Sequence, residues 1–389
     1  MSKYANKLAK SHSTYHKWPT IGERVALLDA DLIPYKVGFT IDEVDLIAAK
    51  LTVESGHVST IQETPQFIDA VDQLNWLVNH WVTTAKCDAA KLYLTDSPNQ
   101  FRFGVAFTQK YKDRKSEKPP FFYELKQYLV EMHDAIVATE NEADDLMSIE
   151  MWKESELLMK QGVRLGSQDH HDLSSLVCVS IDKDLRINAG MHFNPDKQKH
   201  EWVTELGYLD AEYVNKEVKH YEEWPTIQGT PISPASIERK HTALLDTWKR
   251  GAKAGTRKTK RVLVGTKPSS AINKLRGAGL MFFYAQLITG DEVDGYSGLK
   301  GKGKGFAYDL LHRCKSEREL FNAVLGAYRE HYGSTFNAKN YRGGTRVLKP
   351  YQLMLEQGRL AWMQRYEGEL WREGKGPQPP RGDEEDSWT

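Results

Sequence analysis

Short apolar segments that end in aspartate recur along this 389-residue chain, and they limit the folds that it can adopt. Arg24–Asp29 and Lys91–Asp96 each close on an aspartate, and the apolar run Leu176–Ile181 is followed directly by Asp182. Runs of this length are typical of strands buried on both faces. Helical spacing of apolar residues over 66–86 separates the first two runs. We therefore predict an α/β fold with a largely parallel central sheet flanked by helices.

The predicted strands would bring acidic groups together at one edge of the sheet. The carboxyl ends of parallel strands meet at one rim, where the functional groups of such folds collect. Asp29, Asp96 and Asp182 each lie at such an end. Glu142–Asp145 follows a further strand candidate, Ala135–Ala138, and opens a predicted helix. Four distant segments are thus expected to supply carboxylates to one site.

A rim with this many carboxylates predicts bound cations. Like charges within about 4–6 Å raise one another's pKa and destabilise the fold. Mg²⁺ prefers oxygen ligands and uses few carboxylates per ion, so the six to nine acids here suggest two ions. Two ions about 3.5–4 Å apart suit phosphodiester cleavage. Each acid alone has a simpler explanation, because a strand-end aspartate often caps a helix, and Asp144 and Asp145 would also complement a helix dipole.

Three further motifs, each taken alone, fail to match a specific ligand-binding loop, although Asp182 and Asp184 still count among the acids of the rim. The run Asp169–Asp172 lies in a predicted polar loop, and adjacent side chains rarely bind one ion together. Asp182 and Asp184 resemble the start of a calcium loop that lacks its glycine and closing glutamate. The glycine-rich run 298–305 lacks the Gly-Lys-Ser/Thr of a phosphate loop. The three cysteines form no CxxC pair, so neither a disulfide framework nor a zinc knuckle is expected.

Charge is unevenly distributed although the net charge is zero, with 53 basic and 53 acidic residues. Residues 247–290 contain ten Lys or Arg and no Asp or Glu. A block of one sign either remains a solvated loop or meets a polyanion. The block by itself does not distinguish these two readings.

Composition and pattern divide the chain into five parts. We expect an N-terminal extension at 1–20, an α/β catalytic core at 21–200 and a polar, basic insertion at 201–276. A helical region with the DNA-binding hairpin is expected at 277–372, and a disordered tail at 373–389. Helices are expected near 121–132, 280–288, 306–311, 317–331 and 350–372. No apolar stretch approaches the ~18 residues of a membrane span and the N-terminus shows no signal segment, so we expect a cytoplasmic protein without a membrane partner.

Several motifs carry a family resemblance. They are Glu142-Ala-Asp-Asp145, Ser180-Ile-Asp-Lys-Asp184, the glycine-rich run Gly290–Gly303, Thr95-Asp-Ser97 and Tyr111–Lys115. Their order and spacing resemble the flap endonuclease, or 5′-nuclease, superfamily. Within it the chain most resembles the stand-alone 5′→3′ exonucleases of T7-like bacteriophages. The resemblance covers roughly residues 21–345, apart from the insertion 201–276.

The resemblance implies a PIN-like 5′-nuclease fold and a Mg²⁺-dependent 5′→3′ exodeoxyribonuclease with 5′-flap and RNA-primer-removing activity. It implies two Mg²⁺ ions, which Mn²⁺ can replace. The implied ligands of the first ion are Asp29, Asp96, Glu142 and Asp144, with Asp145 shared or nearby. Those of the second ion are Asp182, Asp184, Asp291 and Asp294. Tyr111, Lys112 and Arg114 match a basic segment that contacts the scissile phosphate, and Tyr111 would stack on an unpaired terminal base.

A glycine- and lysine-rich segment matches the family's helix–turn–helix hairpin, which grips the duplex backbone. Its implied DNA-binding residues are Gly298, Lys300, Gly301, Lys302, Gly303 and Lys304. Glycines let the main chain approach phosphates closely. The segment departs from the family pattern because Lys302 replaces an apolar residue, the usual lysine is shifted to Lys304, and Ser297 replaces a proline. The added charge favours duplex binding, whereas K⁺ binding at the turn, a family habit, is left open.

The implied substrates are duplex DNA with 5′ ends or flaps and RNA–DNA hybrids, and replication proteins are candidate partners. A phage-encoded protein of this kind would act in the host cytoplasm. Two alternatives remain. A PIN-class ribonuclease shares the acidic rim but lacks a hairpin such as 290–305. A non-catalytic DNA-binding replication protein would have lost ligand acids, whereas all nine positions here hold acids.

Overall fold

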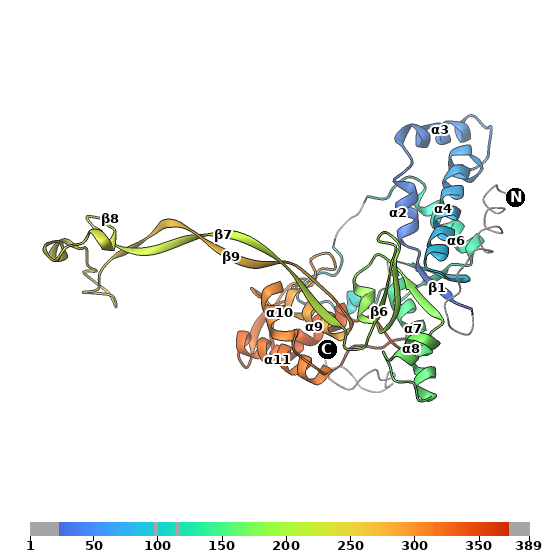
Figure 1. Ribbon diagram of the computed structural model, residues 1–389. Coiled ribbons are helices and arrows are strands. Elements are labelled where there is room, and N and C mark those ends of the chain that lie inside the picture. The colour runs from blue at the N-terminus through green and yellow to red at the C-terminus, as the bar shows by residue number, and fades with distance from the viewer. Residues whose placement is uncertain (1–22, 97–99, 114–116, 373–389) are drawn as a thin grey trace. The chain divides into compact units, whose positions relative to one another are not determined.

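The structure of the chain is a computed structural model (Figure 1). It describes residues 23–96, 100–113 and 117–372. The predicted N-terminal extension 1–20 and the predicted disordered tail 373–389 lie outside the described residues. Arg114, predicted to contact the scissile phosphate, also lies outside them.

The chain divides into two compact units. The first comprises the residues up to Asp210 and those from Leu275 onward, and the second comprises Ala211–Lys274. The second unit falls within the region predicted as an insertion, 201–276. Among the described residues, no helix is long and apolar enough to cross a lipid bilayer.

A six-stranded sheet forms the centre of the first unit. Its strands are β1 (Val25–Asp29), β2 (Ala89–Thr95), β3 (Ile136–Ala138), β4 (Leu176–Val179), β5 (Gly190–Asn194) and β6 (Lys199–Val203). The strand order is β3-β2-β1-β4-β5-β6, and neighbours are parallel except for β5 and β6. The predicted α/β class with a largely parallel sheet is confirmed. Because β1 lies between β2 and β4, the connections leave it in opposite directions, and such switch points bind ligands beyond the strand ends.

The two central strands are buried on both faces, which explains their unbroken apolar sequence. In β1, Ala26 and Leu28 pack into one hydrophobic cluster, whereas Leu27 packs into a second cluster on the opposite face. In β4, Cys178 belongs to the same cluster as Leu27. Successive side chains of a strand point to opposite faces, so one apolar run supplies both layers of the core.

Helices cover both faces of this sheet. The helices of this part of the chain, not all of which contact the sheet, are α2 (Leu32–Gly38), α3 (Glu43–Glu54), a 3-10 helix (Ile61–Glu63), α4 (Pro65–Thr84), α5 (Arg102–Val105), α6 (Phe122–His133), α7 (Ala143–Lys160) and α8 (Gln168–Leu173). α4 begins where Thr64 Oγ1 accepts the Phe67 N–H, a usual N-terminal cap. Its apolar positions at helical spacing, including Phe67 and Leu74, are buried in one cluster with β1, as the pattern predicts.

The Asp169–Asp172 run lies in helix α8, so the prediction of a loop there was wrong. Ser167 caps this helix by accepting the His170 N–H. The His170 ring is buried, with Nε2 3.1 Å from Ser155 Oγ and Nδ1 accepting the Gly166 N–H. His170 therefore has a structural role.

The region after the second unit is mainly helical. It contains α9 (Gly279–Thr289), α10 (Lys304–Leu311), α11 (Glu317–Tyr332), the hairpin β10 (Phe336–Lys339) and β11 (Thr345–Leu348), and α12 (Pro350–Ala361). Residues 280–288 of α9 are all buried, and α10, α11 and α12 pack around them. A helix that is apolar on all sides is expected at the centre of a core.

The predicted helix over 350–372 was wrong beyond Ala361, where α12 ends. The residues that follow replace helical hydrogen bonds with contacts to one buried carboxylate. The Trp362 Nε1–H and the Arg365 N–H donate to Glu369 Oε2 over 3.1 and 2.6 Å. This local cluster of side chain and backbone overrides the helical propensity of the segment.

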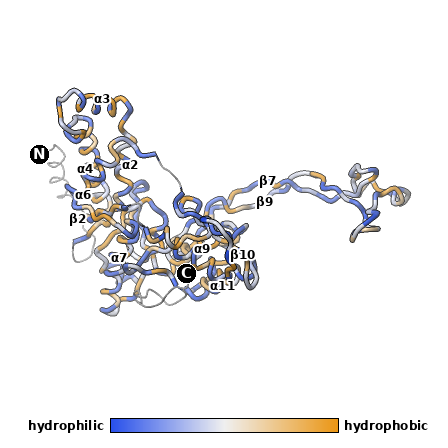
Figure 2. Tube along the Cα trace, turned by 180° about the vertical axis from the view of Figure 1, so that it is seen from behind, coloured by the Kyte–Doolittle hydropathy of each residue, from blue (hydrophilic) through white to orange (hydrophobic). Residues whose placement is uncertain are grey.

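The region predicted as a polar insertion, 201–276, contains long strands that its sequence pattern does not predict. They are β7 (Tyr208–Ile227) and β9 (Thr259–Ala278), with the short β8 (Thr230–Pro231), in the order β8-β7-β9. Short 3-10 helices lie at Pro234–Ser236 and Arg239–Leu244. Figure 2 shows that hydrophilic residues predominate along β7 and β9. Most of their side chains are exposed, so no alternation of buried apolar residues marks them.

Candidate active site

A cleft of about 1050 Å³ opens where β1 and β2 end and α7 begins. Its acidic lining residues are Asp29, Asp31, Asp96, Glu142, Asp144 and Asp182. Its basic lining residues are Lys112, Lys118 and Lys126. Five of the nine acids singled out in the sequence therefore line one cleft. Asp31 and two of the lysines were not anticipated.

Hydrogen bonds fix the carboxylates beyond the two central strands. Asp29 ends β1 and accepts the Ser180 hydroxyl at 2.9 Å. The same hydroxyl oxygen accepts the Asp182 N–H at 2.9 Å, and Asp182 Oδ1 accepts the Asp184 N–H at 2.9 Å. The Ser-x-Asp-x-Asp spacing thus turns the chain after β4 so that Asp182 lies near Asp29.

The acids at the centre of the cleft are poorly neutralised. Burial, together with the charges of Asp31 and Asp182, raises the pKa of Asp29 to about 7. Burial also raises the pKa of Asp144 well above its usual range, with Asp29 and Asp182 adding to the effect. Close carboxylates of this kind favour either protonation or a bound cation.

A second acidic group lies beside the first and comprises Asp184, Asp291 and Asp294. Burial and the charge of Asp182 raise the pKa of Asp184 to about 8, and Gln286 Nε2 donates to its Oδ1 over 2.5 Å. Burial, opposed mainly by Lys112, raises the pKa of Asp294 to about 6. For Asp291, burial opposes ionisation, but a 2.5 Å bond from Lys183 outweighs it and holds the pKa below its usual value.

The loop 290–298 is closed by glycines that no other residue could replace without strain. Asp291 and Tyr296 pair as an antiparallel bridge. Gly290 and Gly298 have φ values of 68° and 62°, and a Cβ on Gly298 would lie 2.3 Å from the Gly290 nitrogen. Gly295, at φ 79°, would place a Cβ 2.4 Å from the Lys110 carbonyl oxygen. The glycines therefore hold Asp291 and Asp294 in place and dock the loop on the Lys110–Lys112 segment.

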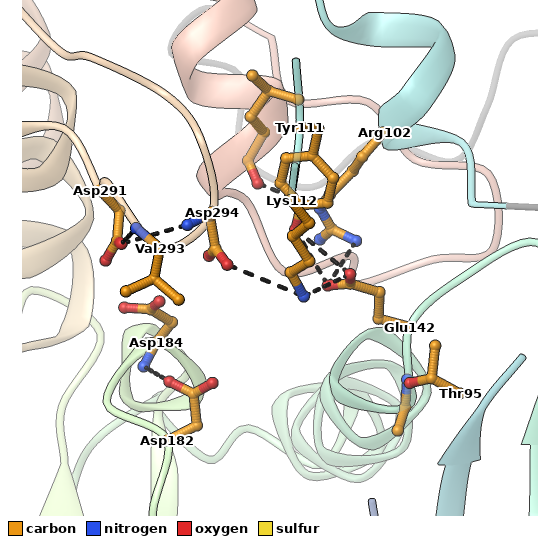
Figure 3. Close-up of polar contacts among 12 residues, drawn as sticks. Thr95, Arg102, Tyr111, Lys112, Glu142, Asp182, Asp184, Asp291, Val293 and Asp294 are labelled. Carbon is orange, nitrogen blue, oxygen red and sulfur yellow. Dashed lines mark hydrogen bonds and ion pairs between the residues drawn. The ribbon is translucent and has the colours of Figure 1, made fainter. Parts of the chain in front are cut away.

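Lys112 lies between Glu142 and Asp294 (Figure 3). Its N–H donates to the Asp294 carbonyl at 3.0 Å, and its backbone has a positive φ of 46°. Its Nζ lies 2.6 Å from Glu142 Oε1 and 3.9 Å from Asp294 Oδ1. Burial disfavours the ammonium, but Glu142 and Asp294 outweigh it and raise the lysine pKa. Lys112 is thus a fixed cation at the wall of the cleft.

Tyr111 is buried rather than facing the cleft. Its side chain is 2% exposed, and its hydroxyl donates to Glu142 Oε1 and Oε2 over 3.3 and 3.2 Å. A ring in this position does not stack on a base. Its neighbour Phe103 lies at a ring-centroid distance of 6.1 Å. The structure therefore places Tyr111 as a support for Glu142.

Asp145 does not reach the cleft either. It is fully buried, and Arg102 Nη1 and Nη2 donate to its two oxygens over 2.5 and 2.8 Å. The same carboxylate accepts the N–H groups of Glu142 and Gln364, both at 3.1 Å. The two oxygens of Asp145 thus accept four hydrogen bonds. Asp145 therefore has a structural role, because these bonds connect α7 to the segment after α12.

The glycine- and lysine-rich turn leads into α10. The Gly298 N–H donates to Gln357 Oε1 at 2.8 Å, and Gly301 has a φ of 75° with open space around it. Lys300, Gly301, Gly303 and Lys304 are exposed. Lys302 is half-buried, with its Nζ 4.3 Å from the centre of the Phe306 ring. The turn therefore presents open backbone and two exposed lysines to solvent.

The cleft also has aromatic and polar residues that the sequence analysis missed. Asp31 accepts the Thr95 N–H at 3.0 Å and a bond from Lys126 Nζ at 2.9 Å. The sequence signal that could have identified Asp31 is its position two residues after Asp29, because a turn that follows a strand stays near the end of that strand. Tyr123, 69% exposed, also lines the cleft, and Lys118 Nζ lies 4.8 Å from the centre of the Tyr35 ring.

The donor set fits a hard divalent cation by its chemistry. All the acids named above offer oxygen, the ligand that Mg²⁺ prefers, and several carry raised pKa values that a cation would lower. Among residues 23–96, 100–113 and 117–372, no three His, Cys, Asp or Glu side chains are grouped so that they could hold a metal ion as they stand.

No model of a protein family matches the chain, and no curated protein matches it significantly.

Proposed function

We propose that this chain is a divalent-metal-dependent 5′→3′ nuclease that hydrolyses phosphodiester bonds of DNA, with the PIN-like fold that its motifs resemble. One observation carries the proposal. Carboxylates from the ends of three neighbouring parallel strands and from the start of α7 line a single cleft, and Lys112 lies in its wall. A cleft of this composition suits a phosphate diester, because it combines ligands for cations with a fixed positive charge.

Asp29, Asp144 and Asp182 would hold Mg²⁺ or Mn²⁺, with Asp96 nearby on the cleft wall. The second acidic group, Asp184, Asp291 and Asp294, would hold or orient a second ion. Bound Mg²⁺ would supply a nucleophilic water and stabilise the leaving oxygen. The raised pKa values of Asp29 and Asp184 support this reading, because they mark charge that the protein alone does not compensate.

Glu142 orients Lys112 in this proposal rather than serving mainly as a metal ligand. Its carboxylate is buried and already accepts bonds from Lys112 and Tyr111, and Arg102 Nη1 lies 3.5 Å away. The ammonium of Lys112 would meet negative charge that develops on the phosphate. Tyr123 and Tyr35 at the cleft rim, instead of Tyr111, would stack on an unpaired 5′-terminal base.

One assay tests the proposal. The purified protein is incubated with 5′-labelled blunt DNA duplex, a 5′-flap duplex, an RNA–DNA hybrid and single-stranded RNA, each with Mg²⁺ and with EDTA. We expect Mg²⁺-dependent release of 5′-phosphorylated nucleotides and short oligonucleotides from the DNA-containing duplexes. Cleavage of single-stranded RNA alone would favour the PIN-class ribonuclease, and binding without cleavage would favour the non-catalytic DNA-binding protein.

A further inference from the structure

The structure divides the basic block of the sequence into two parts with different surroundings. One part lies on β9, which carries Lys260, Arg261, Lys267, Lys274 and Arg276. The neighbouring strand β7 carries five acids, which are Asp210, Glu212, Glu217, Glu222 and Glu223. The two strands are cross-linked where Thr259 donates to Glu223 and Thr266 to Glu217, over 2.7 and 2.9 Å. Because β7 also carries Lys216 and Lys219, its acids offset only part of the positive charge of β9.

The other part of the block forms a small hairpin, residues 247–258, which we call the basic tip. Thr247 and Arg257 pair as an antiparallel bridge. The Trp248 N–H donates to the Thr256 carbonyl at 2.9 Å, and the Gly255 N–H donates back to the Trp248 carbonyl at 2.8 Å. The basic tip is thus an ordered element of the second unit.

The basic tip carries cations without acids. Its basic residues are Lys249, Arg250, Lys253, Arg257 and Lys258, and the first four are exposed. The nearest acid along the chain, Asp246, is engaged by the turn before it: its two oxygens accept the Gly229 and Gln228 N–H groups and the Thr226 hydroxyl. Asp246 therefore anchors the basic tip, and its charge interacts with that of the half-buried Lys258.

The shape of the basic tip suits contact with phosphates. Only small residues, Gly251, Ala252, Ala254, Gly255 and Thr256, lie between its cations. These residues let the backbone approach a polyanion without steric hindrance. Trp248, 45% exposed, offers a flat apolar surface with Lys258 Nζ 5.0 Å from the centre of its ring. A two-stranded β-ribbon also has dimensions that a duplex groove accepts.

We propose that the basic tip binds the phosphate backbone of duplex DNA, independently of base sequence, as a second contact in addition to the cleft. The choice of DNA rests on the proposed function. Backbone contacts by Lys and Arg position a duplex without reading its bases. Because each contact releases condensed counterions, the basic tip would contribute a salt-sensitive share of the affinity.

The test is a salt series of DNA binding in EDTA, where no cleavage interferes. Fluorescence anisotropy of a labelled duplex is measured for the wild type and for a tip variant, Lys249→Ser/Arg250→Ser/Lys253→Ser/Arg257→Ser. The plot of log affinity against log salt should flatten by roughly 0.9 for each lost contact, up to about 3.6 in total. A matched variant of the β7–β9 strands, Lys216→Ser/Lys219→Ser/Lys260→Ser/Lys267→Ser, should change the slope much less, because those exposed lysines lie among acids.

Further arms make the outcome decisive. Arg250→Lys/Arg257→Lys should keep the wild-type slope, since charge and not geometry is required. An unchanged slope in the folded tip variant overturns the proposal, as does an equal loss in the matched variant. The proposal is also overturned if the tip variant loses binding to anionic phospholipid vesicles but keeps its DNA binding. The basic tip would then bind a membrane surface and not DNA. If the wild type cleaves DNA and the tip variant binds normally, only this inference fails. If the tip variant loses DNA binding and the wild type never cleaves, only the proposed nuclease activity fails.

Discussion

Lys112 and Lys110 lie two residues apart but in different surroundings. Lys112 lines the cleft between Glu142 and Asp294, whereas Lys110 is exposed and pairs with Asp113. We predict that Lys112→Ala slows single-turnover cleavage by about 10²–10³, the usual cost of one transition-state donor, and weakens DNA binding little. Lys110→Ala is the matched control and should cleave at a near-normal rate. A normal rate with weaker binding in Lys112→Ala would make this lysine an anchor only.

Removing the charge of Asp144 and that of the adjacent Asp145 should affect the stability of the protein differently. Asp145 and Arg102 are both fully buried and paired, so Asp145→Ala leaves an uncompensated guanidinium in the core. We predict a loss of about 3–5 kcal/mol in the free energy of unfolding, measured by urea titration. Asp144→Ala relieves repulsion in the cleft and should not destabilise the metal-free protein. Equal destabilisation by both substitutions would contradict this assignment of roles.

At the scale of elements, the glycine- and lysine-rich turn that leads into α10 offers a test of duplex binding by the first unit. Changing Lys300, Lys302 and Lys304 to serine removes up to three phosphate contacts. The log–log salt slope of duplex binding should then flatten by roughly 0.9 per lost contact. Cleavage of short single strands should change little, because they need no duplex grip. An equal loss of activity on single strands and duplexes would show that the turn does not hold the duplex.

The elements also show what the sequence could and could not predict. Asp29, Asp96 and Asp182 were placed at one rim because apolar runs mark buried strands and parallel strands end together. The burial of Asp145 was not predictable in this way, since it depends on Arg102, which also bonds to the carbonyl of Leu360, 258 residues further on. β7 and β9 escaped notice because exposed strands need no apolar alternation.

For the molecule as a whole, the carboxylate cleft should make stability depend on pH. The pKa values of Asp29 and Asp184 are raised to about 7 and about 8 by burial and neighbouring acids. Groups with raised pKa contribute stability that is fully present below the unfolded value of about 3.9 and is lost as pH rises through the folded value. We predict that the temperature midpoint of unfolding, measured in EDTA, decreases as the pH rises from about 4 to about 8. Added Mg²⁺ should make this decrease smaller. A midpoint that rises across this window would contradict the account.

The most direct test of the proposed nuclease compares the wild type with Asp144→Asn. Release of label from a 5′-labelled duplex is measured with Mg²⁺ and with EDTA, and thermal unfolding is measured in EDTA. The account predicts Mg²⁺-dependent cleavage by the wild type and none by Asp144→Asn, whose metal-free midpoint is unchanged or higher because one half-buried repulsive charge is gone. Near-normal Mg²⁺-dependent cleavage by Asp144→Asn, or cleavage by the wild type in EDTA, would contradict it.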